Sequence, residues 1–240
     1  MSTYEIDPAG VTDTGHVRPT NQDQLLIEGD LVAVADGMGG GPRGEVASRL
    51  AVDTMKEAFA ADPTATGLVD AVGAANRAVW ERADADPGLQ GMGTTIAAVA
   101  LVADGVEHRL AVVNVGDSRV YLLRQGQLSR LTTDHSEVAE LVRAGELSED
   151  DARTHARRHI LTRVMGVGPE VEPNVSEAEP ARGDRLLLCS DGLFNELDED
   201  EIADVLRADT EPNETADRLV ELANDRGGSD NITAVVVDLR

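Results

Sequence analysis

Apolar residues recur along the chain with two different spacings, and each spacing predicts one kind of element. Short runs rich in β-branched and other aliphatic residues predict strands, at residues 25–27, 31–35, 94–102, 106–115, 119–123, 185–189 and 232–237. The segments Ala103-Asp104-Gly105 and Gln125-Gly126 place glycine where a tight turn needs a positive φ. We therefore expect hairpins at both places and mostly antiparallel sheets.

Four other segments carry apolar residues three or four positions apart, which brings them onto one face of a helix. Two of these stripes consist of Val46, Leu50, Met55 and Phe59 and of Leu68, Val72, Ala75, Val79 and Trp80; two later ones consist of Ile202, Val205 and Leu206 and of Ala216, Leu219, Val220 and Ala223. Asp198 with Glu201 three residues later is typical of a capping box, and Pro212 stands where a first helical turn tolerates proline. Each set of two helices is expected to form a pair.

Strand segments and helix pairs alternate in blocks, which favours an α+β fold in which sheets pack together and helices cover them outside. The 240 residues fit a single domain spanning 1–240, because one core commonly grows to about 250 residues before a chain divides. Residues 134–180 are polar, helical in pieces and poor in strand pattern. We expect this segment to be an insertion lying over the ends of the sheets.

Charge and composition narrow the classes of partner. Acidic residues outnumber basic ones by 45 to 21, and the net charge of −24 repels nucleic acid and anionic lipid, since no basic cluster offsets it. The single cysteine, Cys189, stands in an apolar run and is expected to be a buried small hydrophobe. With no secretory signal and no apolar run of about 20 residues, we expect a cytoplasmic monomer without a membrane partner.

Four aspartates stand at or beside the ends of predicted strands: Asp36, Asp117, Asp191 and Asp230. A strand end holds a carboxylate rigidly and leaves it open to solvent, and an adjacent glycine allows close approach of a ligand. Hard divalent ions such as Mg²⁺ and Mn²⁺ prefer such oxygen ligands. For any one of these aspartates an ordinary Asp-Gly or Asp-Asn turn is the preferred interpretation. Together the four indicate a possible metal site, and spacing alone says no more.

Six ordered motifs carry a more specific signal. They are TDTGHVRPTNQD at 12–23, VADGMGG at 34–40, GTT at 93–95, VGDSR at 115–119, CSDGL at 189–193 and SDNIT at 229–233. In this order, across almost the whole chain, they resemble the motifs of bacterial protein phosphatase 2C proteins. The resemblance implies a four-layer αββα sandwich of two antiparallel sheets flanked by helix pairs. It also implies hydrolysis of phosphoserine and phosphothreonine on proteins, in opposition to bacterial serine/threonine kinases.

The resemblance further implies roles for individual residues. Asp36 is expected to bridge two Mn²⁺ or Mg²⁺ ions that activate a water, Asp191 and Asp230 to complete the first ion's site, and the Gly37 carbonyl to serve the second. A third ion, found in bacterial relatives, would lie between Asp191 and Asp117.

Arg18 matches the family's phosphate-binding arginine, and a guanidinium suits that task because it donates two parallel hydrogen bonds. Asp13 and Asp23 are expected to orient Arg18 or waters, and Gln22 replaces a glutamate found in some members. The chain also departs from the family at Met38 and Gly41, where relatives often carry histidine. We therefore assign no general acid from the sequence.

Two histidines, His155 and His159, lie four residues apart, but without a third ligand they are expected to be surface residues rather than zinc ligands. In the family pattern they belong to a flap beside the active site, where Arg157 and Arg158 would meet the charges of a phosphopeptide; taken alone they would be a solvated face. Two other functions compete with the enzyme: a pseudophosphatase that has lost its metals, and a regulator dedicated to one switch protein. The presence of Asp36, Gly37, Asp191 and Asp230 argues against the first, and the absence of a visible sensor domain argues against the second.

Overall fold

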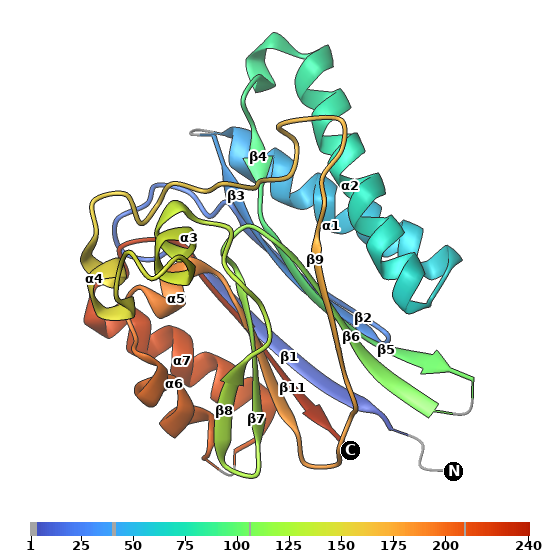
Figure 1. Ribbon diagram of the computed structural model, residues 1–240, viewed down its shortest axis with the longest axis vertical. Coiled ribbons are helices and arrows are strands. Elements are labelled where there is room, and N and C mark those ends of the chain that lie inside the picture. The colour runs from blue at the N-terminus through green and yellow to red at the C-terminus, as the bar shows by residue number, and fades with distance from the viewer. Residues whose placement is uncertain (1–3, 40–41, 106, 209) are drawn as a thin grey trace.

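The computed structural model describes residues 4–39, 42–105, 107–208 and 210–240, which build two antiparallel sheets lying face to face (Figure 1). The first sheet has the order β1-β11-β10-β7-β8, with β1 (Ile6–Asp13), β11 (Ile232–Leu239), β10 (Arg185–Cys189), β7 (Arg119–Arg124) and β8 (Gln127–Arg130). The second has the order β2-β3-β5-β6-β9, with β2 (Asp23–Glu28), β3 (Leu31–Met38), β5 (Ile96–Asp104), β6 (Glu107–Val115) and β9 (Asn174–Ala178), and short β4 (Gly93–Thr94) pairs with β3. Gly40, Gly41 and Val106, which the sequence analysis singled out, lie outside the described residues.

Both predicted hairpins are present. Strands β5 and β6 pair in antiparallel register from Ile96 opposite Val115 to Asp104 opposite Glu107. Between β7 and β8, Gln125 and Gly126 have φ angles of 52° and 79°. Positive φ at both central residues is the condition for the two-residue turns that match the twist of a hairpin.

The central strands are apolar at nearly every position because both of their faces are buried. In β3, Val32 and Val34 contact the facing sheet, whereas the intervening Ala33 and Ala35 contact the helices outside. This alternation follows from the two-residue period of a strand. The buried residues of the cluster between the sheets are all aliphatic.

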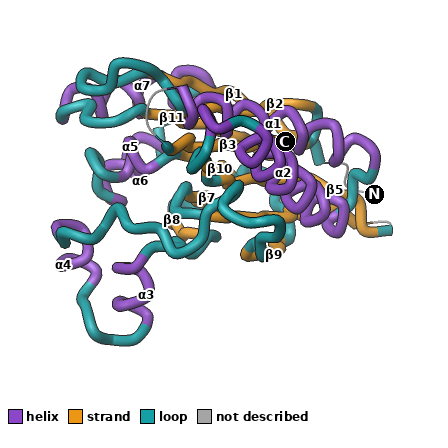
Figure 2. The backbone as a smooth tube through the Cα atoms, turned by 90° about the horizontal axis from the view of Figure 1, so that it is seen from above, coloured by secondary structure: helices purple, strands orange, loops and turns teal. Residues whose placement is uncertain are grey.

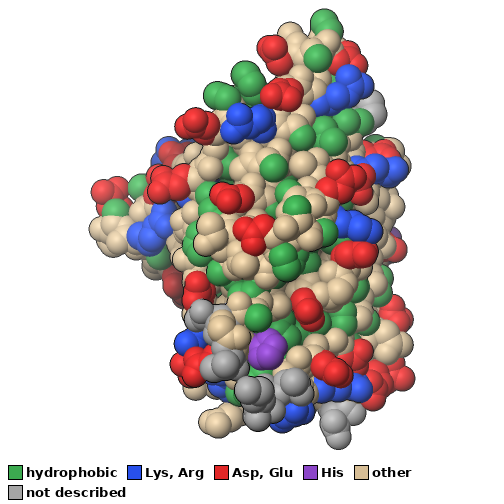
Figure 3. Space-filling view, turned by 90° about the vertical axis from the view of Figure 1, so that its right-hand side faces the viewer, with side chains coloured by type: hydrophobic (Ala, Val, Ile, Leu, Met, Phe, Trp, Pro, Cys, Tyr) green, Lys and Arg blue, Asp and Glu red, His purple; other side chains and the backbone are tan. Residues whose placement is uncertain are grey.

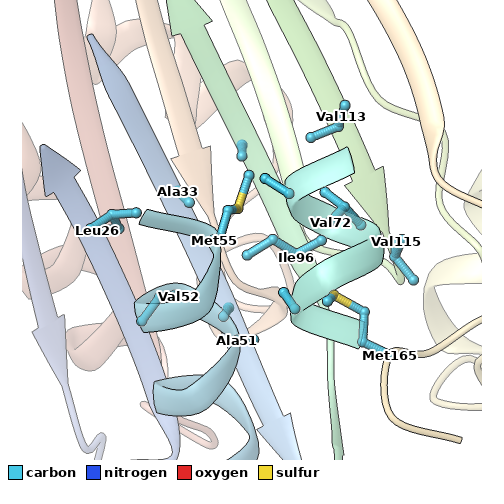
Figure 4. Packing of buried hydrophobic residues seen from close by; sticks show 14 of the residues in the cluster. Leu26, Ala33, Ala51, Val52, Met55, Val72, Ile96, Val113, Val115 and Met165 are labelled. Carbon is cyan, nitrogen blue, oxygen red and sulfur yellow. The ribbon is translucent and has the colours of Figure 1, made fainter. Parts of the chain in front are cut away.

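A pair of long helices, α1 (Pro42–Ala61) and α2 (Ala65–Ala85), covers the outer face of the second sheet (Figures 1 and 2). Figure 4 shows Met55 of α1 and Val72 of α2 packed beside Ile96 of β5. A short 3₁₀ turn, η1 (Pro87–Leu89), follows α2. These helices are the first predicted pair.

The second helix pair, α6 (Glu199–Leu206) and α7 (Pro212–Arg226), covers the first sheet together with the short α5 (Asp191–Phe194). The predicted capping box is confirmed: Asp198 Oδ1 accepts from the Glu201 N–H at 2.9 Å, and Glu201 Oε2 accepts from the Asp198 N–H at 3.2 Å. Pro212 begins α7 as predicted. The layers therefore follow the expected αββα order.

Residues 134–180, which we call the flap, contain α3 (Glu137–Arg143), α4 (Glu149–Thr154) and β9. Figure 2 shows α3 and α4 standing away from the body of the molecule. Strand β9 pairs with β6 in antiparallel register. The apolar runs did not mark β9 or β1, and they indicated β8 only through the hairpin expected at Gln125-Gly126. All three are edge strands, with one neighbour each, so they have fewer buried positions and β1 even tolerates Pro8.

Acidic and basic side chains are interspersed over the face shown in Figure 3. Within the described ranges, no helix is both long and apolar enough to cross a membrane.

Candidate functional site

The fold brings the four singled-out aspartates to one edge of the two sheets. Asp36 lies two residues before the end of β3, Asp117 lies in the turn from β6 to β7, Asp191 begins α5 directly after β10, and Asp230 precedes β11 by two residues. In the first sheet, Cys189 at the end of β10 pairs with Ala234 of β11 and with Arg119 of β7, so the segments that carry Asp191, Asp230 and Asp117 lie side by side. In the second sheet, Asp36 of β3 pairs with Asp23 of β2. Segments far apart in the sequence thus contribute one carboxylate each.

The strand containing Asp36 is longer than the sequence predicted. It runs on to Met38 because Gly37 and Met38 pair with Thr94 and Gly93 of β4. Asp36 is held here by both of its backbone groups: its N–H donates to Thr95 Oγ1 at 2.9 Å, and its C=O accepts from the Thr95 N–H at 2.9 Å. The Thr94 hydroxyl donates to the same carbonyl at 2.9 Å. The GTT motif therefore acts as the support of Asp36.

Two glycines in the motifs are required by close packing of backbone. A Cβ on Gly37 would lie 2.1 Å from the carbonyl oxygen of Gly44 in α1, and a Cβ on Gly192 would lie 2.1 Å from the carbonyl oxygen of Asn231. Neither distance is compatible with a side chain. The absence of a Cβ at Gly192 lets the start of α5 lie against the loop of Asp230, which brings Asp191 and Asp230 together.

The carboxylates are close enough to change one another's acidity. Burial raises the pKa of Asp36 well above its ordinary value, and the charges of neighbouring aspartates add to this effect, in the order Asp23, Asp191, Asp117 and Asp230. Burial likewise raises the pKa of Asp191, with Asp230 adding to it, while a hydrogen bond with Asp36 acts in the opposite direction. Burial and the charge of Asp191 raise the pKa of Asp117. Mutual repulsion of this kind is what a bound cation relieves.

Asp23 lies beneath this group and is 1% exposed. Its Oδ2 accepts hydrogen bonds from the hydroxyls of Ser190 and Thr233, both at 2.7 Å, whereas its buried Oδ1 has no hydrogen-bond partner among the described residues. Burial raises the pKa of Asp23 to about 7, against the effect of the two hydroxyls. Asp23 thereby links β2 to the residue before Asp191 and to β11.

Arg18 reaches the same edge from the loop after β1. Its Nη2 donates to Asp230 Oδ2 at 2.7 Å, and its side chain is 53% exposed. Asp13, which the sequence analysis paired with Arg18, instead accepts from the Gly15 N–H at 2.8 Å and from Asn224 Nδ2 at 3.2 Å. In the described structure the carboxylate that orients Arg18 is that of Asp230.

A groove of about 650 Å³ extends from the aspartates to the flap. Asp117 and Asp191 line this groove together with Arg158 and His159 of the flap. The structure does not place His155 and His159 on one helix, because α4 ends at Thr154 and His155 is its C-cap. The predicted surface position of His159 is confirmed, whereas His155 is half-buried.

The donor set consists of oxygen atoms only, which suits Mg²⁺ or Mn²⁺ and disfavours softer metals. In the described part of the chain, no three acidic, histidine or cysteine side chains already stand in metal-ligating positions. The aspartates are thus gathered at one place without forming a finished coordination shell. Their donor chemistry and their mutual repulsion fit divalent cations.

Residues 16–225 match the family model described as protein phosphatase 2C. This chain belongs to the protein phosphatase 2C family. The serine/threonine protein phosphatase PstP of Mycobacterium tuberculosis is 40% identical over 240 residues, which are 99% of this chain and 46% of that relative. The chain therefore spans about half the length of that relative.

Solved structures agree with the family assignment. The PPM Ser-Thr phosphatase MsPP from Mycobacterium smegmatis, solved in complex with cacodylate, has a TM-score of 0.89 and 46% identity, covering 97% of each chain. The catalytic domain of a serine/threonine phosphatase PstP, in complex with two manganese ions, has a TM-score of 0.89 and 38% identity, covering 99% of each chain. The two antiparallel sheets with flanking helices are thus the fold of this family of phosphatases.

The sequence alone does not reveal how the family motifs support one another. Ser118 of the VGDSR motif shares a hydrogen bond of 2.7 Å with Thr95, which in turn holds Asp36. Asn231 of the SDNIT motif accepts from the Gln22 N–H at 2.9 Å and donates to two carbonyls, those of Thr14 and Thr20. The only available signal was the presence of small polar residues inside the motifs, which predicts hydrogen bonding without naming the partner.

Proposed function

We propose that this chain is a metal-dependent phosphatase that hydrolyses phosphoserine and phosphothreonine on proteins. The observation that carries the proposal is the convergence of Asp36, Asp117, Asp191 and Asp230, from separate segments, at one edge where burial and mutual charge raise the pKa of three of them. Such clustering is costly for a carboxylate and recurs where function requires it. The family assignment supports the reaction class.

Four acidic positions would hold the ions. We propose that Asp36 bridges two Mn²⁺ or Mg²⁺ ions, that Asp191 and Asp230 bind the first, and that the Gly37 carbonyl binds the second. Asp117, together with Asp191, would hold a third. When bound, the paired ions lower the pKa of a water and offset charge on the phosphoryl oxygens.

Arg18 would bind the phosphoryl group of the substrate. Its side chain is exposed and contacts Asp230, one of the four clustered aspartates. The planar guanidinium can donate two parallel hydrogen bonds to two phosphate oxygens. Hydrolysis forms a bond from the water oxygen to phosphorus and breaks the bond from phosphorus to the serine or threonine oxygen. One proton must reach that departing oxygen. Met38 has a thioether that cannot donate it, so solvent in the open site is proposed as its source.

We further propose that residues 1–240 act as one catalytic unit, with the flap at 134–180 lying beside the substrate. The cellular role would be to oppose bacterial serine/threonine kinases in the cytoplasm. The relatives are named as serine/threonine phosphatases, which supports this substrate class for the chain.

The test is release of inorganic phosphate from a phosphothreonine peptide by purified protein, with Mn²⁺, with Mg²⁺ or with a chelator. We expect turnover with metal and its loss in chelator, and recovery when metal is returned. Asp36→Asn, purified in parallel, should be folded and inactive. Full turnover in chelator would overturn the metal mechanism, and a folded protein that binds the peptide but releases no phosphate with either metal would identify a pseudophosphatase.

A further inference from the structure

Arg119 begins β7 two residues after Asp117, and its side chain is 16% exposed. It forms a forked ion pair with Asp134: Nε lies 3.1 Å from Oδ1, and Nη2 lies 2.7 Å from Oδ2. Asp134 is the first residue of the flap. The turn that carries Asp117 is therefore tied on its β7 side to the base of the flap.

The same guanidinium also contacts the helix that carries Asp191. It stacks on the ring of Phe194, with 3.6 Å from Cζ to the ring centroid, and Phe194 is the last residue of α5, which Asp191 begins. Its Nη1 donates to the Tyr121 hydroxyl at 2.9 Å, and that hydroxyl donates to Glu199 of α6 at 3.3 Å. Arg119 thus contacts Asp134 and Phe194 at the same time, from a position two residues after Asp117.

The other side of the turn is held by the next residue of the flap. The His135 N–H donates to the Gly116 carbonyl at 2.9 Å, and the Gly116 N–H donates to His135 Nδ1 at 3.0 Å. Gly116 has a φ of 97°, which an L side chain rarely adopts. Asp117 consequently stands between two anchors that are consecutive in the flap, Asp134 and His135.

We propose that Arg119 is a positioning residue that fixes Asp117 relative to Asp191 and couples this pair of carboxylates to the base of the flap. The inference rests on the proposed function, in which Asp117 and Asp191 hold an ion. A guanidinium is required because it donates to Asp134 from its edge while its face lies on Phe194. A lysine ammonium keeps the charge but has no such plane.

A purely structural role is the competing explanation, because any buried ion pair affects stability when one partner is lost. The chain contains a matched pair for comparison. Arg185 forms a similarly forked ion pair with Asp238, at 2.6 Å from Nε to Oδ1 and 2.8 Å from Nη2 to Oδ2, and its side chain is 11% exposed. This pair stands at the end of β10 remote from Asp191. Arg185 also donates to the carbonyls of Leu206, Ala208 and Thr210 and to the Thr215 hydroxyl. Arg185→Lys therefore removes a forked ion pair, together with further hydrogen bonds, without touching the four aspartates of the site.

The experiment compares Arg119→Lys with Arg185→Lys in three measurements, of which the first two are made well below the melting temperature of both variants. Mn²⁺ titration by calorimetry gives the affinity of each ion, hydrogen exchange gives the protection of residues 134–143, and thermal unfolding gives the shared loss of stability. For Arg119→Lys we expect the weakest Mn²⁺ to bind about tenfold less tightly, since partners that orient a ligand contribute roughly 10–100-fold to metal affinity. We also expect faster exchange in 134–143. Arg185→Lys should lower the melting temperature and change neither of the other two.

The proposal is overturned if Arg119→Lys binds Mn²⁺ and protects the flap as the unmodified chain does, or if Arg185→Lys changes both to the same extent. If Arg119→Lys does not fold, Phe194→Leu removes the stacking face alone and should give the same two changes at smaller size; an unchanged Phe194→Leu protein then overturns the proposal. A failure of the proposed function looks different. In that case the unmodified chain itself shows no Mn²⁺ binding and releases no phosphate.

Discussion

Arg18 and Asp230 stand 212 positions apart in the sequence, and Nη2 of the first donates to Oδ2 of the second at 2.7 Å. The other carboxylate oxygen, Oδ1, accepts from the Asn231 N–H at 2.8 Å. Both oxygens of Asp230 therefore already accept hydrogen bonds. A cation that binds Asp230 draws on the same lone pairs as Arg18, and a phosphoryl group that binds Arg18 draws on the same guanidinium as Asp230.

The first prediction is that Arg18→Ala tightens Mn²⁺ binding while it weakens substrate binding. Removal of one positive charge and one competing donor should lower the dissociation constant of the ion held by Asp230 by up to about fivefold, because an exposed ion pair contributes at most about 1 kcal/mol. The KM for a phosphopeptide should rise. Calorimetric Mn²⁺ titration and steady-state kinetics on the same protein check both effects.

Arg18→Lys separates charge from geometry in that experiment. It keeps the positive charge and should leave the Mn²⁺ affinity near that of the unmodified chain, yet it should still raise the KM because an ammonium cannot donate two parallel bonds. An Arg18→Ala protein with unchanged kcat/KM would show that Arg18 lies outside the substrate site.

The second prediction contrasts Asp36→Asn with Asp117→Asn. An amide at position 36 removes a negative charge where we propose that two ions meet, so two Mn²⁺ ions should bind less tightly and activity should fall at least about a thousandfold, at the upper end of the cost of losing one preorganised charge-stabilising group. Asp117→Asn should weaken the proposed third ion alone, with activity partly restored by excess Mn²⁺. If Asp36 only closed a turn before Gly37, asparagine would serve nearly as well and both metal binding and rate would survive.

The third prediction concerns the pH dependence of stability without metal. The pKa of Asp23 is raised to about 7, and those of Asp36, Asp117 and Asp191 are raised in the same direction. The folded chain therefore binds more protons than the unfolded chain between about pH 4 and pH 7. The contribution of these groups to the stability of the folded chain is fully present below about pH 4, and it is lost as the pH rises through their pKa values in the folded chain. In chelator, the melting temperature should fall between pH 5.5 and pH 8.

Asp36→Asn is the control for that pH dependence. It removes one member of the repelling group, so the metal-free variant should melt at a higher temperature at pH 8 than the unmodified chain and show a flatter pH profile. Saturating Mn²⁺ should raise the melting temperature most at pH 8, because binding requires deprotonated carboxylates. The prediction would be contradicted if the melting temperature of the metal-free protein rose steadily from pH 5.5 to pH 8 and if the unmodified chain and Asp36→Asn showed the same profile.

The parts of the fold that the sequence predicted are those buried on two faces or marked by local chemistry. The part of β10 from Leu186 to Cys189 is apolar at every position because both faces are covered, and the Asp198–Glu201 capping box is a local signal that spans four residues. The edge strands β8 and β9 carry no apolar run, because one neighbour and partial exposure leave no such pattern, and only the turn at Gln125-Gly126 pointed to β8. The helix α5 is only four residues long, which is too short for a helical period to register.

The candidate site likewise has parts that the sequence predicted and parts that it did not. Motif resemblance identified Asp36 and Asp191 as candidates, since each stands in a short distinctive string. It did not identify the contact of Arg119 with Asp134, because both are charged residues within polar stretches of the sequence. Only the pairing of β7 with β10 and the path of the flap bring these two residues together with Phe194. Hydrogen bonds that close over long sequence separations, such as Thr233 to Asp23, depend on topology and leave no local trace.

The flap provides the last prediction, because it presents two adjacent arginines in different settings. Arg157 forms an ion pair with Glu137 of α3, so its charge is already balanced within the flap. Arg158 makes no ion pair among the described residues and lines the groove that also contains Asp191. We therefore expect Arg158 to meet the acidic groups of a phosphoprotein segment lying in the groove, and Arg157 to hold the shape of the flap.

Arg158→Ala should raise the KM for a phosphoprotein several-fold and spare a small aryl phosphate, which is too short to reach the flap. The difference should shrink at high salt, because partly exposed charges are screened. Arg157→Ala, the matched control, removes the same charge one position away and should change the two substrates to a similar, smaller extent by loosening α3. Equal losses of kcat/KM on both substrates in the Arg158 variant would place Arg158 outside substrate recognition. A larger selective loss in the Arg157 variant would reverse the assignment, because the ion pair with Glu137 would then have to open when the phosphoprotein binds.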